Sequence, residues 1–118
     1  MRGEAQAVAW LQRHGLVLLQ RNFRTPGRGG GEIDAIMRDP DGTLVFVEVR
    51  TRADAGHGGA AASISKTKQK RIILAARHYL QRWRSAPPCR FDVMACDGDA
   101  LQPDADWQWL PAAFDASA

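Results

Sequence analysis

The segment EIDAIMRDPDGTLVFVEVRTR, residues 32–52, predicts a β-hairpin. Its two arms, Glu32 to Arg38 and Thr43 to Thr51, alternate in polarity or are rich in Val and Phe, as β-strands are. The residues Asp39-Pro40-Asp41-Gly42 between them favour a tight turn, because proline fixes φ and glycine suits the last position. Since side chains alternate along a strand, the first arm should present two sets: Ile33, Ala35 and Met37 on one face, and Glu32, Asp34 and Ile36 on the other.

The second arm carries charged residues among valines. Glu48 and Arg50 are two residues apart and share a face with Phe46, whereas Val45, Val47 and Val49 should face the core. Charged side chains in such a strand are costly to bury unless they are paired or bind a metal. The hairpin can place Asp34 beside Glu48, and a divalent cation such as Mg²⁺ would relieve the repulsion between the two carboxylates. The spacing equally suits a salt-bridge network on a solvated face of the sheet.

A metal held by Asp34 and Glu48 would suit phosphodiester hydrolysis. It would polarise a phosphoryl oxygen and lower the pKa of a bound water. Arg50 is placed to stabilise the charge that develops on the phosphate. Its guanidinium stays protonated, so it is a poor general base.

Before the hairpin, residues Gly3 to His14 predict a helix, with Gly15 suited to its end. Leu16 to Phe23 predicts a strand, and residues 25–31 form a glycine-rich loop. Arg21, Arg24 and Arg28 surround this loop, and together with its backbone N–H groups they can hold a phosphate backbone. The loop can equally be a flexible connection in which the arginines occur by chance.

After the hairpin, residues 53–64 predict a loop rich in Gly, Ala and Ser, and Ser65 can cap a helix from about Lys66 to Trp83. Its apolar stripe is expected to be Ile72, Ala76, Tyr79, Leu80 and Trp83. Arg90 to Cys96 predicts another strand, and Trp107 to Leu110 a short edge strand followed by a turn through Phe114. The sequence therefore predicts one α/β domain over residues 1–118, with an α-β-β-β-α-β core and a mixed sheet flanked by helices.

The charges are unevenly distributed along the chain. Residues 1–90 contain all 16 Lys and Arg and seven acids, a net charge of +9, whereas residues 91–118 contain six Asp and no basic residue, a net charge of −6. A basic body suits a polyanion such as DNA or RNA, although an ordinary solvated surface would show the same balance. The acidic C-terminal segment, residues 97–118, can repel nucleic acid or cover part of the basic surface.

Other residue types favour a cytoplasmic protein without membrane segments. The chain has no apolar run of about 18 residues and no visible secretion signal. Cys89 and Cys96 are seven residues apart and should point to opposite faces of a strand, so we expect two thiols in a reducing cytosol. His14, His57 and His78 lack metal-site spacing, and the four tryptophans are expected to pack in the core or at its edge.

Several motifs together resemble the YraN family, bacterial proteins predicted to be endonucleases distantly related to archaeal Holliday-junction resolvases. The resemblance covers nearly the whole chain. The motifs that carry it are Gly3-Glu4, Asn22-Phe23-Arg24, Gly31-Glu32-Ile33-Asp34, Phe46-Val47-Glu48-Val49-Arg50-Thr51-Arg52, Lys68-Gln69 and Cys89-Arg90-Phe91-Asp92-Val93.

The resemblance implies a restriction-endonuclease-like fold in which Asp34 and Glu48 are the metal carboxylates and Glu4 is the outer acid of the site. Glu4 can equally be a carboxylate favoured by the helix dipole. Arg50 occupies the position where the superfamily usually has a catalytic lysine. We hypothesise that Lys68 supplies the missing amine, although it can also be a solvated residue near a helix start. Gln69 can contact a phosphate or face solvent.

The function expected from these observations is a Mg²⁺- or Mn²⁺-dependent endonuclease acting on DNA, including branched or structured DNA. The residues expected to contact nucleic acid are Arg21, Arg24, Arg28, Arg52, Lys68, Gln69 and Lys70. The alternatives are a catalytically inactive nucleic-acid-binding module of nuclease fold, which Arg50 favours, and a protein–protein adaptor. Because the related resolvases act as dimers, a homodimer is also expected.

Overall fold

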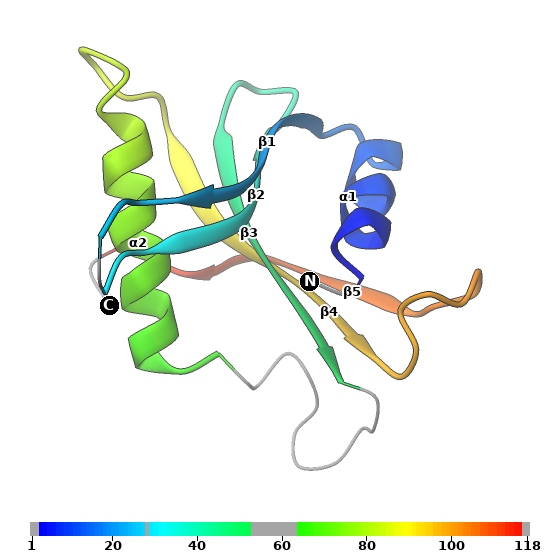
Figure 1. Cartoon of the computed structure of the whole chain (residues 1–118). Coiled ribbons are helices and arrows are strands. Elements are labelled where there is room, and N and C mark those ends of the chain that lie inside the picture. The colour runs from blue at the N-terminus through cyan, green and yellow to red at the C-terminus, as the bar shows by residue number, and fades with distance from the viewer. Residues whose placement is uncertain (1–2, 28, 53–63, 117–118) are drawn as a thin grey trace.

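A five-stranded mixed sheet lies between two helices (Figure 1). The computed structural model describes residues 3–27, 29–52 and 64–116. In chain order the elements are α1 (Glu4–Arg13), β1 (Val17–Arg24), β2 (Glu32–Arg38), β3 (Leu44–Arg52), α2 (Lys66–Leu80), β4 (Cys89–Asp97) and β5 (Trp107–Phe114).

The strands lie side by side in the order β1-β2-β3-β4-β5. β1, β2 and β3 form an antiparallel meander, β4 runs parallel to β3, and β5 is antiparallel to β4. A parallel neighbour requires a crossover connection, and α2 lies within it. The structure therefore confirms the predicted α/β class and the α-β-β-β-α-β core expected of a restriction-endonuclease-like domain, with β5 added at one edge.

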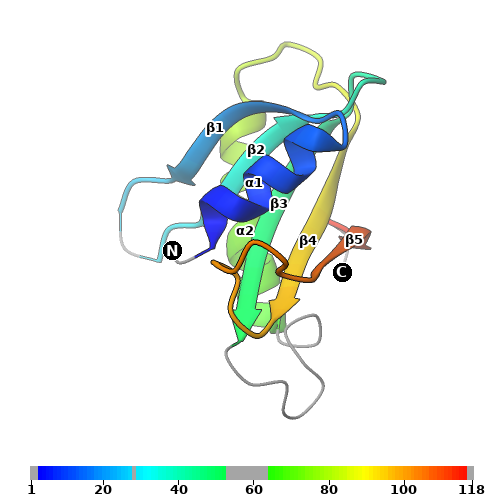
Figure 2. The same ribbon diagram turned by 90° about the vertical axis from the view of Figure 1, so that its right-hand side faces the viewer.

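Each helix covers one face of the sheet (Figure 2). α1 contributes Ala7, Val8 and Leu11 to a core that includes Val45, Val47 and Val49, as predicted for these three valines. α2 packs on the other face, where its buried residues share a core with Ile36, Phe46 and Phe91. Since Glu48 and Arg50 alternate with the three valines on β3, they belong to the face that α2 covers.

Hydrogen bonds confirm the predicted hairpin turn, the end of α1 and the start of α2. Gly15 has a φ of 98°, and the N–H groups of Gly15 and Leu16 donate to Gln12 and Leu11, which closes α1 in a Schellman motif. The N–H of Gly42 donates to the carbonyl of Asp39 at 2.9 Å in the hairpin turn. The Ser65 hydroxyl accepts from the N–H of Lys68 at 3.1 Å, so Ser65 caps α2.

Two element boundaries differ from the prediction. α2 ends at Leu80 instead of Trp83, because the chain continues with i→i+3 hydrogen bonds and the Arg82 guanidinium stacks on the Tyr79 ring at 4.0 Å. Trp83 contacts Tyr79 but remains 38% exposed, so it is not part of a buried stripe. β5 extends to Phe114, where a turn was expected, since hydrogen bonds from Ala112 and Trp109 hold it on β4.

Cys89 is exposed and Cys96 is buried, and both are free thiols, as expected from their spacing. In the described ranges, no helix combines the length and apolar character needed to cross a membrane.

Candidate active site

The strands β2 and β3 separate in the middle of the sheet (Figure 1). Their pairing covers only Ala35–Arg38 against Leu44–Val47, whereas β3 continues to Arg52 along β4. Asp34 lies directly beyond the last pair, and its Oδ2 accepts a hydrogen bond from the N–H of Val49 at 2.8 Å. The carboxylate thus binds a β3 backbone group that the departing β2 no longer pairs. We call this place the strand fork.

The neighbouring β1 is also irregular at this level. Asn22 has a φ of 53° and lies between the pairs Arg21–Ala35 and Phe23–Ile33. Left-handed backbone is uncommon outside glycine and reverses the usual alternation. Accordingly Phe23 and Ile33 both lie in the core beneath α2, together with Ile36. The prediction that Ile33 shares a face with Ala35 and Met37 is therefore wrong, because regular alternation does not continue through this irregular segment of β1 and β2.

Glu48 is the most unusual residue of the fork. It is 1% exposed, Asp34 is 8% exposed, and neither Glu48 oxygen has a hydrogen-bond partner among the described residues. Burial, and next the neighbouring Asp34 carboxylate, raise the pKa of Glu48 to about 8. A buried carboxylate without hydrogen bonds is costly for the folded state unless it is neutralised.

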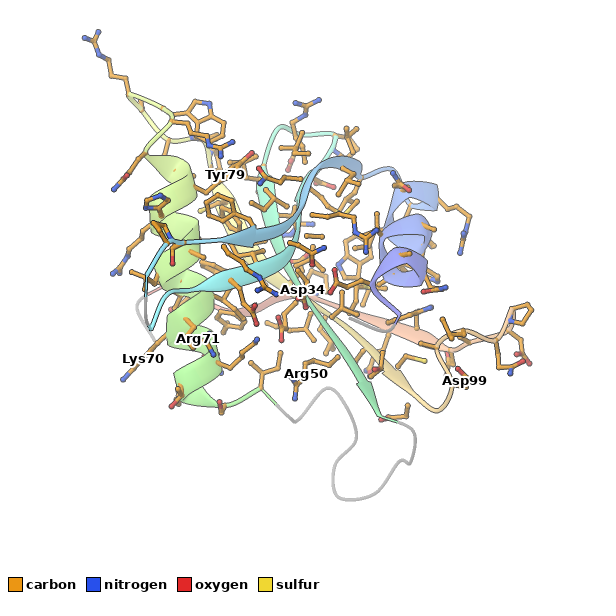
Figure 3. All side chains as sticks on the ribbon, in the orientation of Figure 1. Asp34, Arg50, Lys70, Arg71, Tyr79 and Asp99 are labelled. Atoms are coloured by element: carbon orange, nitrogen blue, oxygen red, sulfur yellow. The ribbon has the colours of Figure 1, made fainter. Side chains whose placement is uncertain are left out.

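Two cations approach Glu48 from different elements. Lys68 Nζ, from the first turn of α2, lies 3.8 Å from Glu48 Oε2, and Arg50 Nη1 lies 3.6 Å from the same oxygen. The Lys68 ammonium also donates to Glu32 Oε1 at 3.0 Å. That hydrogen bond is the main reason why the pKa of Glu32 is lowered. Figure 3 shows Asp34 at the centre of the sheet and Arg50 farther along β3.

The donor set at the fork suits a hard cation. Asp34 and Glu48 offer carboxylate oxygens, the ligands that Mg²⁺ and Mn²⁺ prefer, and the Glu48 oxygens are buried without hydrogen bonds. Within residues 3–27, 29–52 and 64–116, however, no group of three His, Cys, Asp or Glu side chains is arranged to hold a metal ion. The protein ligands that fit are therefore two carboxylates, and Mg²⁺ commonly keeps several waters.

Glu4 has a different environment. It is 1% exposed on α1, which covers the opposite face of the sheet, and its Oε1 lies 3.5 Å from Arg21 Nη2. The structure thus brings together Glu4 and Arg21, two of the residues predicted for the site, as an ion pair. The expectation that Glu4 is the outer acid of the metal site remains a prediction.

The other predicted contact residues that the structure describes lie on β1 and α2. Arg24 Nε lies 3.6 Å from Glu32 Oε2, and the Gln69 amide donates to the carbonyl of Ile64 at 3.3 Å. Lys70 is exposed and projects outward from α2 (Figure 3). Arg28, His57 and the side chain of Arg52 lie outside the described part of the protein.

Two residues at the site were missed from the sequence. Glu32 lies next to Lys68, and Arg71 Nε donates to the carbonyl of Gly30 at 3.3 Å. The only local signal for Glu32 was its position two residues before Asp34. Arg71 gave none, because the approach of α2 to the glycine-rich loop joins segments about forty residues apart.

Comparison with known proteins places the chain in a family. The model of "Uncharacterised protein family UPF0102" matches residues 3–96. A UPF0102 protein of Albidiferax ferrireducens is 66% identical over 96% of this chain and 84% of its own length. UPF0102 proteins of Paracidovorax citrulli and Polaromonas sp. are 63% and 62% identical, over 98% and 97% of this chain and 82% and 78% of their own. The chain therefore belongs to family UPF0102, which is the YraN family.

Proposed function

We propose that this protein hydrolyses phosphodiester bonds in DNA as a metal-dependent endonuclease. The observation that carries the proposal is Glu48, a buried carboxylate whose oxygens lack hydrogen bonds, beside Asp34 at the strand fork. Burying this carboxylate destabilises the folded protein, and a bound cation would offset that destabilisation.

Asp34 and Glu48 would hold Mg²⁺ or Mn²⁺. When bound, the ion would supply a polarised phosphoryl oxygen and a water of lowered pKa. The Val49 N–H fixes one Asp34 oxygen, which orients the carboxylate before any ligand arrives. Burial at the fork excludes solvent and strengthens the interaction of both carboxylates with a cation.

Lys68 and Arg50 would have different roles. The Lys68 amine is 3.8 Å from Glu48, and an ammonium group can donate a proton to a leaving oxygen or lose one to act as a base. Arg50 remains protonated and would neutralise charge on the phosphate. This arrangement supports the hypothesis that Lys68 supplies the amine for which Arg50 is a poor substitute.

The test is cleavage of a four-way junction, a flap, a single strand and a plain duplex with Mg²⁺ or Mn²⁺. We expect cutting by the wild type, none by Asp34→Asn or Glu48→Gln, and a strong loss in Lys68→Ala. Lys66→Ala is the matched control, because Lys66 is an exposed lysine in the same helical turn. Normal cutting by Lys68→Ala would remove Lys68 from the mechanism. Metal-independent cutting that persists in Glu48→Gln would indicate a contaminating nuclease.

The second candidate is a nucleic-acid-binding module of nuclease fold that does not cut. Two observations favour it: Arg50 occupies the position of the usual lysine, and Lys68 already donates to Glu32 at 3.0 Å. Salt-sensitive binding of DNA by both the wild type and Glu48→Gln, with no cutting under any metal, would establish this module instead.

A preference for branched DNA and action as a homodimer are part of the proposal and rest on the resemblance to resolvases. A four-way junction has two strands to cut, which two copies of one site can do. Light scattering with and without junction DNA tests this part. A single copy bound per junction would contradict it.

A further inference from the structure

Positive charge accumulates around Glu32 in excess of what this carboxylate can neutralise. Lys68 Nζ is 3.0 Å and Arg24 Nε 3.6 Å from its two oxygens, and Arg71 also lowers the pKa of Glu32 through its charge. Lys68 also lies 3.8 Å from Glu48 Oε2, whereas Arg24 and Arg71 share the single carboxylate of Glu32. Since like charges repel, an anionic ligand between Arg24 and Arg71 would stabilise this cluster.

A depression opens at the same place. It has a volume of about 280 Å³ and lies between the glycine-rich loop and α2. Its lining residues are Arg24, Thr25, Gly27, Gly29, Gly30, Gly31, Glu32 and Arg71. Arginines from β1 and α2 thus flank a surface built otherwise from small residues and backbone.

The loop is built so that its backbone comes close to both arginines. The N–H of Gly31 donates to the Thr25 hydroxyl at 2.7 Å, and the N–H of Thr25 donates to the Gly31 carbonyl at 3.0 Å, which closes the loop. A Cβ on Gly30 would lie 2.6 Å from Thr25 Oγ1, so no side chain can fill this space without movement. In the described part of the chain, the one hydrogen bond of Arg71 is from Nε to Gly30, which leaves its terminal nitrogens for a ligand.

We propose that this depression binds a second phosphate group of the nucleic acid, next to the phosphate at the strand fork, through Arg24 and Arg71. The guanidinium group matches the planar geometry of two phosphate oxygens better than an ammonium does. Lys68 joins the two places, because its ammonium group lies between Glu32 and Glu48. A nucleic acid strand would therefore place one phosphate at the fork and a neighbouring one in the depression.

This inference rests on the proposed function for the identity of the ligand, but its test requires neither a metal nor cleavage. The first measurement is titration of the wild type with inorganic phosphate, followed by NMR of the Gly30 and Gly31 amides. We expect saturable shifts of both amides, lost in Arg71→Ala and weakened in Arg24→Ala. The absence of saturable shifts in the wild type would overturn the proposal.

The second measurement is binding of duplex DNA in EDTA at several salt concentrations. Each of Arg24→Ala and Arg71→Ala should reduce the salt slope of log K by about 0.9, the loss of one phosphate contact. Arg13→Ala is the control, because Arg13 is an exposed arginine on α1, across the sheet, and should leave the slope unchanged. Arg24 is 74% exposed, so Arg24→Ala tests the contact without disturbing the loop.

If both Arg24→Ala and Arg71→Ala bind DNA with the same salt slope of log K as the wild type, the proposal is overturned, even if inorganic phosphate binds. If the slopes fall as expected but no metal supports cutting, the phosphate site stands and the proposed nuclease activity fails. The two hypotheses are therefore separable.

Discussion

Glu48 is the residue whose burial destabilises the folded protein at the site. Its pKa is raised to about 8, chiefly by burial, and next by the carboxylate of Asp34. In the unfolded chain the same group has its ordinary value of 4.5. Between pH 4.5 and about 8, Glu48 therefore keeps its proton in the folded protein but is ionised in the unfolded chain. The contribution of Glu48 to the free energy of unfolding falls as the pH rises through this range.

Glu48→Gln should remove this pH dependence. Glutamine is neutral at every pH, so we expect the variant to be more stable than the wild type at about pH 9 in EDTA by at least about 1.4 kcal/mol, which corresponds to one pKa unit. The difference should shrink as the pH falls and vanish below about pH 4, where the wild-type carboxyl is protonated in both the folded and the unfolded state. Urea unfolding followed by circular dichroism at several pH values measures both effects.

Mn²⁺ provides the control for this prediction. An ion that binds the folded wild type should stabilise it by about 2.7 kcal/mol at a hundred times its Kd, while Glu48→Gln should gain little. The assignment of Glu48 as a buried metal ligand would be contradicted if the free energy of unfolding changed equally with pH in the two proteins. Equal stabilisation of the two proteins by Mn²⁺ would also contradict it.

At the scale of residues, the sequence predicted the two carboxylates but not their surroundings. The alternation of β3 was sufficient to put Glu48 and Arg50 on one face opposite three valines. The left-handed Asn22 and the departure of β2 from β3 depend on tertiary pairing, so Ile33 was placed on the wrong face. The contact between Lys68 and Glu32 joins residues 36 apart, and no local pattern specifies it.

At the scale of elements, the contact of β2 with α2 depends on Gly31. A Cβ on Gly31 would collide with the carbonyl oxygen of Arg71 and lie 2.8 Å from the N of Ala75. Helix and strand approach this closely only because the side chain is a hydrogen atom. This contact lies at the middle of α2, the helix that also carries Lys68.

Gly31→Ala should therefore destabilise the protein by about 1 to 3 kcal/mol, the usual cost of overpacking. Gly29→Ala is the matched control, because a Cβ there meets nothing within 4 Å and only the φ of 67° is unfavourable. Its cost should be about 1 kcal/mol. Thermal unfolding of both variants measures this, and equal destabilisation would mean that the helix–strand contact is not tight.

The attachment of β5 to the sheet depends on one buried carboxylate. Asp92 is 0% exposed and accepts hydrogen bonds from Arg90 Nε, the Trp109 indole and the N–H of Ala112. Of the two partners from β5, Ala112 lies where the register against β4 is irregular, whereas Trp109 pairs with Met94 just before this point. Asp92 thus compensates for ladder hydrogen bonds that the irregular register interrupts.

Asp92→Ala should lower the free energy of unfolding by about 3 kcal/mol or more, because it leaves buried donors without an acceptor. Asp39→Ala removes the other acidic partner of Arg90, at 3.5 Å and partly exposed, and should cost less than about 1 kcal/mol. Urea unfolding followed by tryptophan fluorescence measures both. Similar losses in the two variants would show that Asp92 does not hold β5.

The elements themselves were predictable where the signals are local. Ser65, Gly15 and the Asp39–Gly42 turn act through hydrogen bonds to residues three to five positions away, and each was placed correctly. The end of α2 and the full length of β5 were not, because they depend on the Arg82–Tyr79 stack and on Asp92, which are contacts of the folded chain.

At the scale of the molecule, charge is separated in space as it is in the sequence. Lys70 and Arg71 lie on α2, while Asp99 lies on the opposite side of the sheet in the connection between β4 and β5 (Figure 3). That connection also contains Asp104 and Asp106, and Asp97 at the end of β4 directly precedes it; all three are exposed. A nucleic acid approaching this dipolar surface would be directed toward α2 and the strand fork.

Lys70→Ala should therefore reduce the salt slope of DNA binding by about 0.9, whereas Asp104→Asn should leave it unchanged. Fluorescence anisotropy with labelled duplex in EDTA measures both slopes. A changed slope in Asp104→Asn would place nucleic acid on the acidic side and contradict this orientation.

The irregular outer strands have a further consequence for how copies of the protein coexist. β1 is an edge strand that exposes Val17 and Leu19. An apolar edge strand that is also straight and regular can pair with strands of other molecules. Its register shifts between Leu18 and Gln20, and β5 carries Pro111 and the left-handed Ala112. Neither border of the sheet offers a continuous row of hydrogen-bonding groups. Copies of the protein at high concentration would therefore be protected against edge-to-edge aggregation into fibrils.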